Sequence, residues 1–228
     1  SVKLIDQYAF YWCSNLTNVI INEETSNLTK IGNYAFYNAP KLKMINFPKK
    51  IESIGAYAFF AVTAFVRTPK ILRSLTEIGF YAFYGTGCNK KTVGGLSVAY
   101  SYEGEGYAKW LLTASVIQQT TDFFIEKNTI GIAGGACWGF GGNLIGWLEL
   151  GSTDKRTLKY IGDGAFSSNL ITSIVGLQYT QVKTIYDYAF ANCGNLSVAI
   201  RLPNTIESIG IKAFTNTTIS SLSIDQDT

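Results

Sequence analysis

The feature that most constrains the fold is a nine-residue pattern that recurs along the chain. It consists of an aliphatic residue, two variable residues, Ile, usually Gly, two more variable residues, and Ala-Phe. An eighth copy, TIGIAGGAC from Thr129, keeps the spacing but has Cys137 in place of the Phe. Most copies start 23 to 29 residues apart, a period that predicts a solenoid in which each coil buries its apolar face against its neighbours. The seven copies that align without gaps begin at Val2, Leu28, Ile51, Leu75, Leu158, Val182 and Ile206.

Each slot of this repeat frame has a physical role. The aliphatic residue, the Ile and the Phe are expected to point into one core, and the Ala to let neighbouring coils approach. The Gly after Ile provides either a positive backbone φ angle or a close approach of two backbones, and the frame leaves both open. The fold expectation requires one interior row of the rings of Phe36, Phe59, Phe83, Phe166, Phe190 and Phe214.

The residue before the Ala is a tyrosine in five copies: Tyr8, Tyr34, Tyr57, Tyr81 and Tyr188. This recurrence predicts a stacked tyrosine column along the solenoid, in preference to a ligand site. Between the copies lie β-branched or alternating segments that are typical of short strands. These segments cover residues 15–21, 41–48, 143–150, 195–203 and 219–224.

The order of these elements resembles the BspA-like leucine-rich repeat of bacterial and protist surface proteins. The clearest matches run from Ala39 to Phe59 and from Cys193 to Phe214, and the resemblance covers residues 1–83 and 128–224. It implies an α/β-type solenoid dominated by short β-strands, a right-handed stack of about 8–9 coils of 23–24 residues that forms a single rod.

The chain is expected to form a single domain, residues 1–228, with regular repeats over 1–84 and 128–224. The segment 85–127 departs from the repeat. It holds either an insertion or a worn copy of the frame, for which YAKWLLTAS from Tyr107 is the candidate. We expect a secretion signal and an anchor to lie outside this sequence.

The low charge and the absence of histidine exclude several function classes. The net charge is +3 and the Lys and Arg residues are scattered, which argues against nucleic-acid binding. Without histidine, Ser-His-Asp and Cys-His nucleophile systems and imidazole metal sites cannot form. The run GGACWGFGG lacks the Lys of a phosphate-binding loop, so neither a cofactor nor a metal is expected.

The cysteines and one uncharged segment also have structural interpretations. Cys13 and Cys193 occupy a slot that other copies fill with small residues, so we predict buried thiols and no disulfides. Cys88, in the irregular segment, is the only candidate for a reactive thiol. Residues 130–148 carry no charge, which would suit a membrane span by length, but they contain seven glycines and the repeat frame continues through them.

The candidate binding residues lie in the irregular segment. Tyr100, Tyr102, Tyr107 and Trp110 surround a Gly-Glu-Gly turn in LSVAYSYEGEGYAKW. Insertions on one face of a solenoid often bind partners, and Tyr and Trp are enriched in binding hot spots. The two halves of this stretch are expected to form either a projecting hairpin or a worn coil packed into the stack.

The function expected from the resemblance is a non-catalytic, extracellular protein-binding or adhesion module of a cell-surface or secreted protein. The resemblance implies a protein partner, such as a host matrix protein like fibronectin or another surface protein, and a monomer is expected. One alternative is a structural spacer that carries other domains. A remote alternative is a carbohydrate-processing enzyme that uses Glu103 and Glu105 as paired carboxylates.

Overall fold

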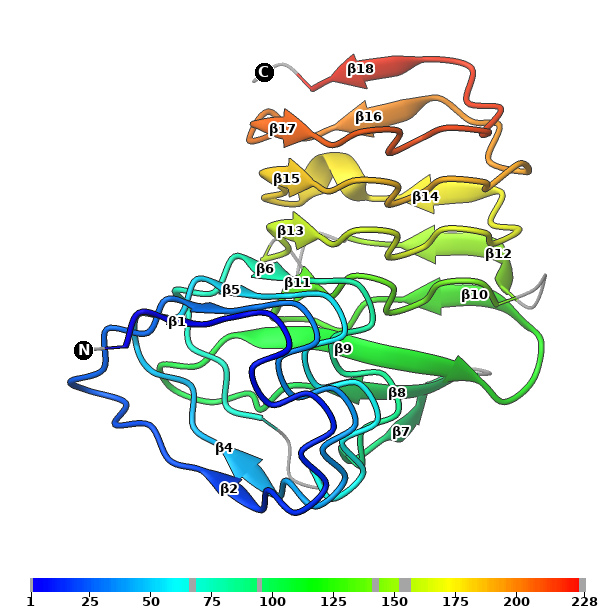
Figure 1. Cartoon of the computed structure of the whole chain (residues 1–228). Coiled ribbons are helices and arrows are strands. Elements are labelled where there is room, and N and C mark those ends of the chain that lie inside the picture. Colours follow the sequence, from blue (N-terminus) through cyan, green and yellow to red (C-terminus); the bar gives the residue numbers. More distant parts are fainter. Residues whose placement is uncertain (1, 66–68, 94–95, 141–143, 152–156, 226–228) are drawn as a thin grey trace.

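The protein folds as a β-solenoid of about eight turns, with two short strands in most turns (Figure 1). The computed structural model describes residues 2–65, 69–93, 96–140, 144–151 and 157–225. Strands of successive coils pair in parallel, so most coils satisfy their backbone groups through the next coil.

One row of strands lies inside the repeat frame, where the Ile and the residue before it pair with the same two residues of the next coil. Sequence patterns did not predict these strands, because two residues are too short to show alternation. In the N-terminal half they are β1 (Leu4–Ile5), β3 (Lys30–Ile31), β5 (Ser53–Ile54) and β6 (Glu77–Ile78). In the C-terminal half they are β11 (Thr129–Ile132), β13 (Tyr160–Ile161), β15 (Thr184–Ile185) and β17 (Ser208–Ile209).

The second row of strands lies in the segments between the frames, and all five predicted strand segments contain one. These strands are shorter than the predicted segments, because each pairs only where the neighbouring coil also runs straight. They are β2 (Asn18–Val19), β4 (Met44–Ile45), β12 (Leu144–Glu149), β16 (Ile200–Leu202) and β18 (Leu222–Ile224). The same row also includes β10 (Thr120–Phe124) and β14 (Ser173–Val175).

Helix is nearly absent from the described residues. The only helix in the part of the chain that the structure describes is the short 3-10 turn η1 (Leu177–Tyr179). The α component of the expected α/β class is therefore not confirmed, and β-solenoid is the better description. No helix among these residues is long and apolar enough to span a membrane. The uncharged stretch after Thr129 instead supplies strands β11 and β12.

The core rings form two rows rather than the single row expected. Phe10, Phe36, Phe59 and Phe83 stack at centroid distances of 5.0 to 5.3 Å. A second row of Phe166, Phe190 and Phe214 stacks at 5.5 and 5.2 Å. Cys137 occupies the Phe slot of the coil between the two rows, and its thiol is too small to bridge them. Most of these rings are fully buried, so the interpretation of the Phe as core residues is confirmed.

The Gly after Ile allows the backbones of two neighbouring coils to approach closely. The positive φ angle occurs at a different position of the repeat frame. A Cβ on Gly55 would lie 2.6 Å from the backbone nitrogen of Asn33 in the preceding coil, far inside van der Waals contact. The left-handed residues are those two positions later, such as Tyr34 (φ 57°) and Tyr57 (φ 56°). The tight coil spacing thus depends on the Gly, while the tyrosines carry the backbone strain.

The tyrosine column forms over the first three coils and then breaks. Tyr34 stacks on Tyr8 at 5.2 Å and on Tyr57 at 4.9 Å, with nearly parallel rings. Tyr81 meets Tyr57 edge to face instead. In the next two coils Gly135 and Gly164 take the tyrosine slot, and the ring of Phe80 fills the space that a Cβ there would need.

The irregular segment contains a hairpin that packs into the stack. Strands β7 (Lys91–Val93), β8 (Leu96–Tyr100) and β9 (Lys109–Val116) are antiparallel, so the predicted hairpin is present. It does not project, however, because β9 also pairs in parallel with β11, with Leu111 opposite Ile132. Strand β9 therefore occupies the place of a coil, as the alternative of a worn copy implied.

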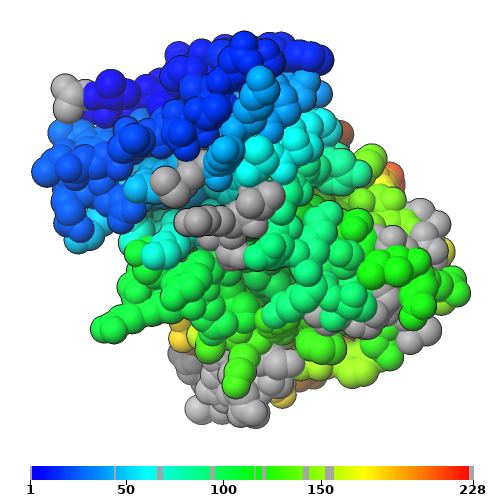
Figure 2. All heavy atoms as spheres, turned by 90° about the horizontal axis from the view of Figure 1, so that it is seen from below, coloured from blue at the N-terminus to red at the C-terminus, as the bar shows by residue number. Residues whose placement is uncertain are grey.

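This hairpin separates the chain into two stacks that run in different directions. The C-terminal coils are stacked up the page in Figure 1, whereas the N-terminal coils lie one behind another there and separate in Figure 2. The stacks meet where the Gly134 amide donates to the Ile78 carbonyl (2.7 Å) and the Tyr81 amide donates to the Gly134 carbonyl (2.9 Å). The coils therefore do not continue as the one rod expected, because β9 takes the strand position beside β11 that β6 would otherwise fill.

Three carboxylates gather at this junction. Glu77 of the N-terminal stack lies near Asp163 and Asp187 of the C-terminal stack, and the Tyr186 hydroxyl donates to the Thr76 carbonyl (3.2 Å). Burial, followed by the charges of Asp187 and Glu77, raises the pKa of Asp163 to about 6.

Candidate binding face

The turn between β8 and β9 presents the candidate binding face, and backbone hydrogen bonds hold it against the N-terminal stack. The Tyr102 amide donates to the Pro69 carbonyl (2.9 Å), and the Ala108 amide donates to the Ile71 carbonyl (2.7 Å). Leu72 and Tyr107 form an isolated antiparallel bridge. The turn is therefore fixed at both ends although it lies outside the regular repeat.

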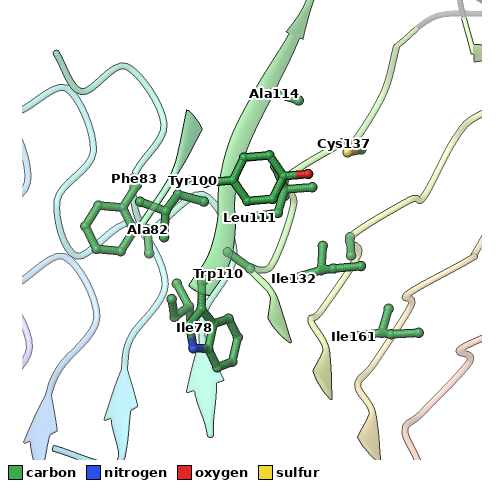
Figure 3. Close-up of a cluster of buried hydrophobic side chains, with 14 of the residues drawn as sticks. Ile78, Ala82, Phe83, Tyr100, Trp110, Leu111, Ala114, Ile132, Cys137 and Ile161 are labelled. Atoms are coloured by element: carbon green, nitrogen blue, oxygen red, sulfur yellow. The ribbon is translucent and has the colours of Figure 1, made fainter. Parts of the chain in front are cut away.

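The structure places two of the four predicted binding residues in the core. Tyr100 is 7% exposed and Trp110 is 1% exposed. Figure 3 shows the ring of Tyr100, the last residue of β8, with its hydroxyl directed towards Cys137, and Trp110 of β9 beside Ile78. The Trp110 ring also stacks on Tyr160 at 5.8 Å. These two rings support the turn from behind, so their replacement by Ala would damage the fold together with any binding.

The other two predicted residues reach the surface. Tyr102 is 43% exposed, and Tyr107 is half-buried beside it, with the rings edge to face at 5.5 Å. The ammonium of Lys70 lies 5.4 Å from the centroid of each ring. The structure thus keeps Tyr102 and Tyr107 as candidate contact residues and adds Lys70, which sequence patterns did not single out.

A buried ammonium anchors the face. The Lys109 side chain is 8% exposed and bonds to Glu103 (2.8 Å) and Glu126 (3.0 Å), while Lys91 bonds to Glu126 (2.5 Å). Burial disfavours the charged ammonium, but the hydrogen bonds that Lys109 donates to both carboxylates outweigh this effect and raise the pKa of Lys109. The network therefore stays ionised near neutral pH and fixes the turn to β9.

The carboxylate pair has no arrangement suited to glycoside hydrolysis. Hydrogen bonds from Lys109 and Asn128 lower the pKa of Glu103, so it remains ionised, whereas a general acid needs a raised pKa. Glu105 lies exposed on the turn. This geometry matches an ion-paired loop and gives no support to the enzymatic alternative.

Two hollows flank the turn. One, of about 330 Å³, lies beside Tyr102, Lys90 and Lys91, and the other, of about 340 Å³, lies beside Tyr107, Arg73 and Asn128. Both are also lined by Glu103 and Lys109, so this ion pair forms the ridge between them. Arg73 and Lys90 are exposed, and neither forms an ion pair within the described ranges.

A second exposed aromatic surface runs along the N-terminal coils. The residue after the core Phe forms its own ladder, from Tyr11 through Tyr37 and Phe60 to Tyr84, at 5.0 to 5.5 Å. Trp138 extends this surface onto the C-terminal stack through Tyr81. This second column was not predicted from the sequence, although the aromatic residues that follow the core Phe in several copies were a visible signal.

The cysteines do not form a reactive or metal-binding group. Cys13, Cys137 and Cys193 are free thiols, and the predicted burial is confirmed for Cys193, whereas Cys13 is only half-buried. Cys88, the candidate reactive thiol, is 3% exposed, and burial raises its pKa, which disfavours the nucleophilic thiolate. Within the described ranges no cluster of three or more His, Cys, Asp or Glu residues is suited to hold a metal ion.

Comparisons with known proteins agree with the repeat architecture. The model of the family described as "BspA type Leucine rich repeat region" matches six copies, over residues 1–99 and 151–228. A search of curated protein sequences finds no significant match.

Several solved structures are similar over nearly the whole chain. The pneumococcal vaccine antigen PcpA is 21% identical over 99% of this chain and 54% of its own, with a TM-score of 0.46. A leucine-rich cell surface protein from Faecalibacterium prausnitzii A2-165 is 19% identical over 97% and 63%, with a TM-score of 0.44. A leucine-rich repeat protein from Bacteroides ovatus is 22% identical over 98% and 49%, with a TM-score of 0.42. The chain thus spans about half to two thirds of the length of these proteins.

Proposed function

The chain belongs to the BspA-type leucine-rich repeat family, and from this premise we propose that it is a non-catalytic protein-binding and adhesion module of a cell-surface or secreted protein. The partner is a protein of the host matrix or of another cell surface. We further propose that residues 1–228 form a single monomeric domain with right-handed coils, regular over 1–84 and 128–224. Its anchor and secretion signal belong to segments beyond this sequence.

The observation that carries the binding role is the surface pair of Tyr102, which is exposed, and Tyr107, which is half-buried, on a turn that the repeat does not require. Tyrosine supplies a large contact area at low entropic cost, and a fixed loop loses little freedom on binding. The backbone bonds to Pro69 and Ile71 and the buried Lys109 provide that fixation. A loop serving only to connect strands would need neither these two surface rings nor the buried ion network.

The test is a binding assay with immobilised fibronectin as the probe protein and the whole chain in solution. Tyr102→Ala combined with Tyr107→Ala should weaken binding by about tenfold or more, because two hot-spot rings are removed. The matched control is Tyr179→Ala, which removes an equally exposed tyrosine from η1 on the C-terminal stack. Thermal unfolding of the double variant should stay close to that of the parent chain.

Two results would decide against this function. Equal affinity of the parent and the double variant would remove the turn from the contact surface. If the parent chain captures neither fibronectin nor any other matrix or surface protein, the structural spacer becomes the better description.

A further inference from the structure

The two hollows beside the turn have similar linings and similar volumes. Each has a tyrosine, Tyr102 in one and Tyr107 in the other, and each has an exposed cation, Lys90 or Arg73. Their volumes, about 330 and 340 Å³, are nearly equal. Two matched hollows on either side of a ridge suit a ligand with repeating units better than a single compact molecule.

The charges of the hollows define the ligand further. The cations Lys90, Lys91, Arg73 and Lys109 line the hollows, and Glu103 is the single acid among the described lining residues. Glu126 neutralises part of this excess through Lys91 and Lys109, but Lys90 and Arg73 are left without a carboxylate partner within the described ranges. Exposed cations of this kind favour anionic groups, and the planar guanidinium of Arg73 suits a carboxylate or a sulfate.

The ridge between the hollows requires ligand groups of the opposite kind, because Glu103 is an acid that accepts hydrogen bonds. Each Glu103 oxygen accepts one hydrogen bond, from Asn128 (2.7 Å) and from Lys109 (2.8 Å), and a carboxylate has acceptor positions left. A ligand that crosses the ridge must therefore bring neutral donors to Glu103 and anions to the hollows. Sugar units that carry both hydroxyl and acidic groups meet this requirement, whereas an acidic peptide would bring its negative charge past the Glu103 carboxylate.

We infer that the twin hollows bind an acidic polysaccharide, with two neighbouring sugar units seated on either side of the Glu103 ridge. Lys90 and Arg73 hold the acidic groups, Glu103 accepts from sugar hydroxyls, and the edges of Tyr102 and Tyr107 pack against the sugar rings. This inference rests on the proposed function for the location of the face. It extends that function from a protein partner to an acidic glycan.

Calorimetric titration with oligosaccharides tests this site directly. The anionic groups of hyaluronan tetrasaccharide are all carboxylates, whereas heparin tetrasaccharide carries sulfates as well. Chitotetraose, which has no anionic group, is the neutral control. Binding of either acidic oligosaccharide with no binding of chitotetraose is expected. Arg73→Ala and Lys90→Ala should each weaken it by about tenfold through the loss of a charged hydrogen bond, whereas Lys43→Ala, an exposed lysine of another coil, should not.

Glu103→Gln separates a sugar site from a merely basic patch. It should weaken acidic oligosaccharide binding at least about threefold, because a carboxylate accepts more strongly than an amide. The same variant should strengthen binding of a poly-glutamate peptide, since it removes a negative charge. Stronger binding of both ligands, or equal losses for Lys43→Ala and Arg73→Ala, would overturn the inference. Retained fibronectin binding without any oligosaccharide binding would overturn it and leave the proposed function intact.

Discussion

Replacing Gly55 by Ala tests the physical basis of the coil stack. The added Cβ would lie 2.5 Å from the Asn33 side-chain oxygen and 2.6 Å from both the Asn33 backbone nitrogen and the Gly32 carbonyl carbon. Two of these three atoms belong to the backbone, so a side-chain rotation cannot relieve the overlap. The coils would have to separate by most of an ångström to restore ordinary contact.

That separation would strain the hydrogen bonds that join the coils at this point. The Gly55 amide donates to the Ile31 carbonyl (2.8 Å), the Tyr34 amide to the Ala56 carbonyl (2.9 Å), and the Ala56 amide to the Asn33 side chain (2.9 Å). Overpacking costs about 1–3 kcal/mol and each weakened hydrogen bond about 0.5–1.5 kcal/mol. Reduced freedom of the unfolded chain returns about 0.4–1 kcal/mol, so we expect a net loss of about 2–3 kcal/mol.

Thermal unfolding followed by circular dichroism measures this loss. For a chain of this length about 2–3 kcal/mol corresponds to a decrease in midpoint of roughly 5–10 °C. Gly194→Ala is the matched control, because a Cβ there meets no atom within 4 Å and φ is not positive. It should leave the midpoint unchanged or raise it slightly. If Gly55→Ala and Gly194→Ala unfold at the same temperature, close backbone approach does not explain the Gly of the repeat.

Two further predictions concern the core and the junction. Phe59→Ala should destabilise the chain by about 3–5 kcal/mol in urea unfolding, because its fully buried ring stacks on both Phe36 and Phe83, and a loss below 1 kcal/mol would contradict the ring-stacking account. Asp163→Asn should stabilise the chain at pH 7.5 by about 1 kcal/mol. This value is smaller than the free energy that the full pKa shift would give, because Asp163 is partly exposed and solvent screens its charge. Burial, Asp187 and Glu77 raise the pKa of Asp163 to about 6, so the folded chain favours its protonated form and loses stability as pH rises from about 4 to about 6. Unfolding midpoints measured across that window should fall for the parent chain and change less for the variant, and an equal pH dependence of the two would refute this assignment.

The repeat shows which features of the local structure can be predicted from a sequence. Each frame repeats the same spacing of Ile, Ala and Phe, so the residues that pack well in one coil also pack well in the next coil. The coil architecture, the burial of most of the Phe rings, the predicted strand segments and the buried thiol of Cys193 could therefore be predicted from the sequence. The two-residue strands inside the frame were missed because no pattern distinguishes them from a turn.

The binding face depends on contacts that no local pattern records. Tyr100 and Trp110 resemble Tyr102 and Tyr107 in the sequence, yet the first pair is buried because β9 pairs with β11 and the N-terminal stack covers the remaining side. The hollows likewise need Arg73 brought beside Asn128, 55 positions further along the chain.

The sequence by itself determined that the chain winds into coils, because every coil meets a neighbour built on the same frame. Only the tertiary structure decided that there are two stacks, since the pairing of β9 with β11 prevents β6 from filling that strand position. Which side chains reach solvent near that junction follows from the packing of segments distant in sequence. The repeat period carries no information about that packing.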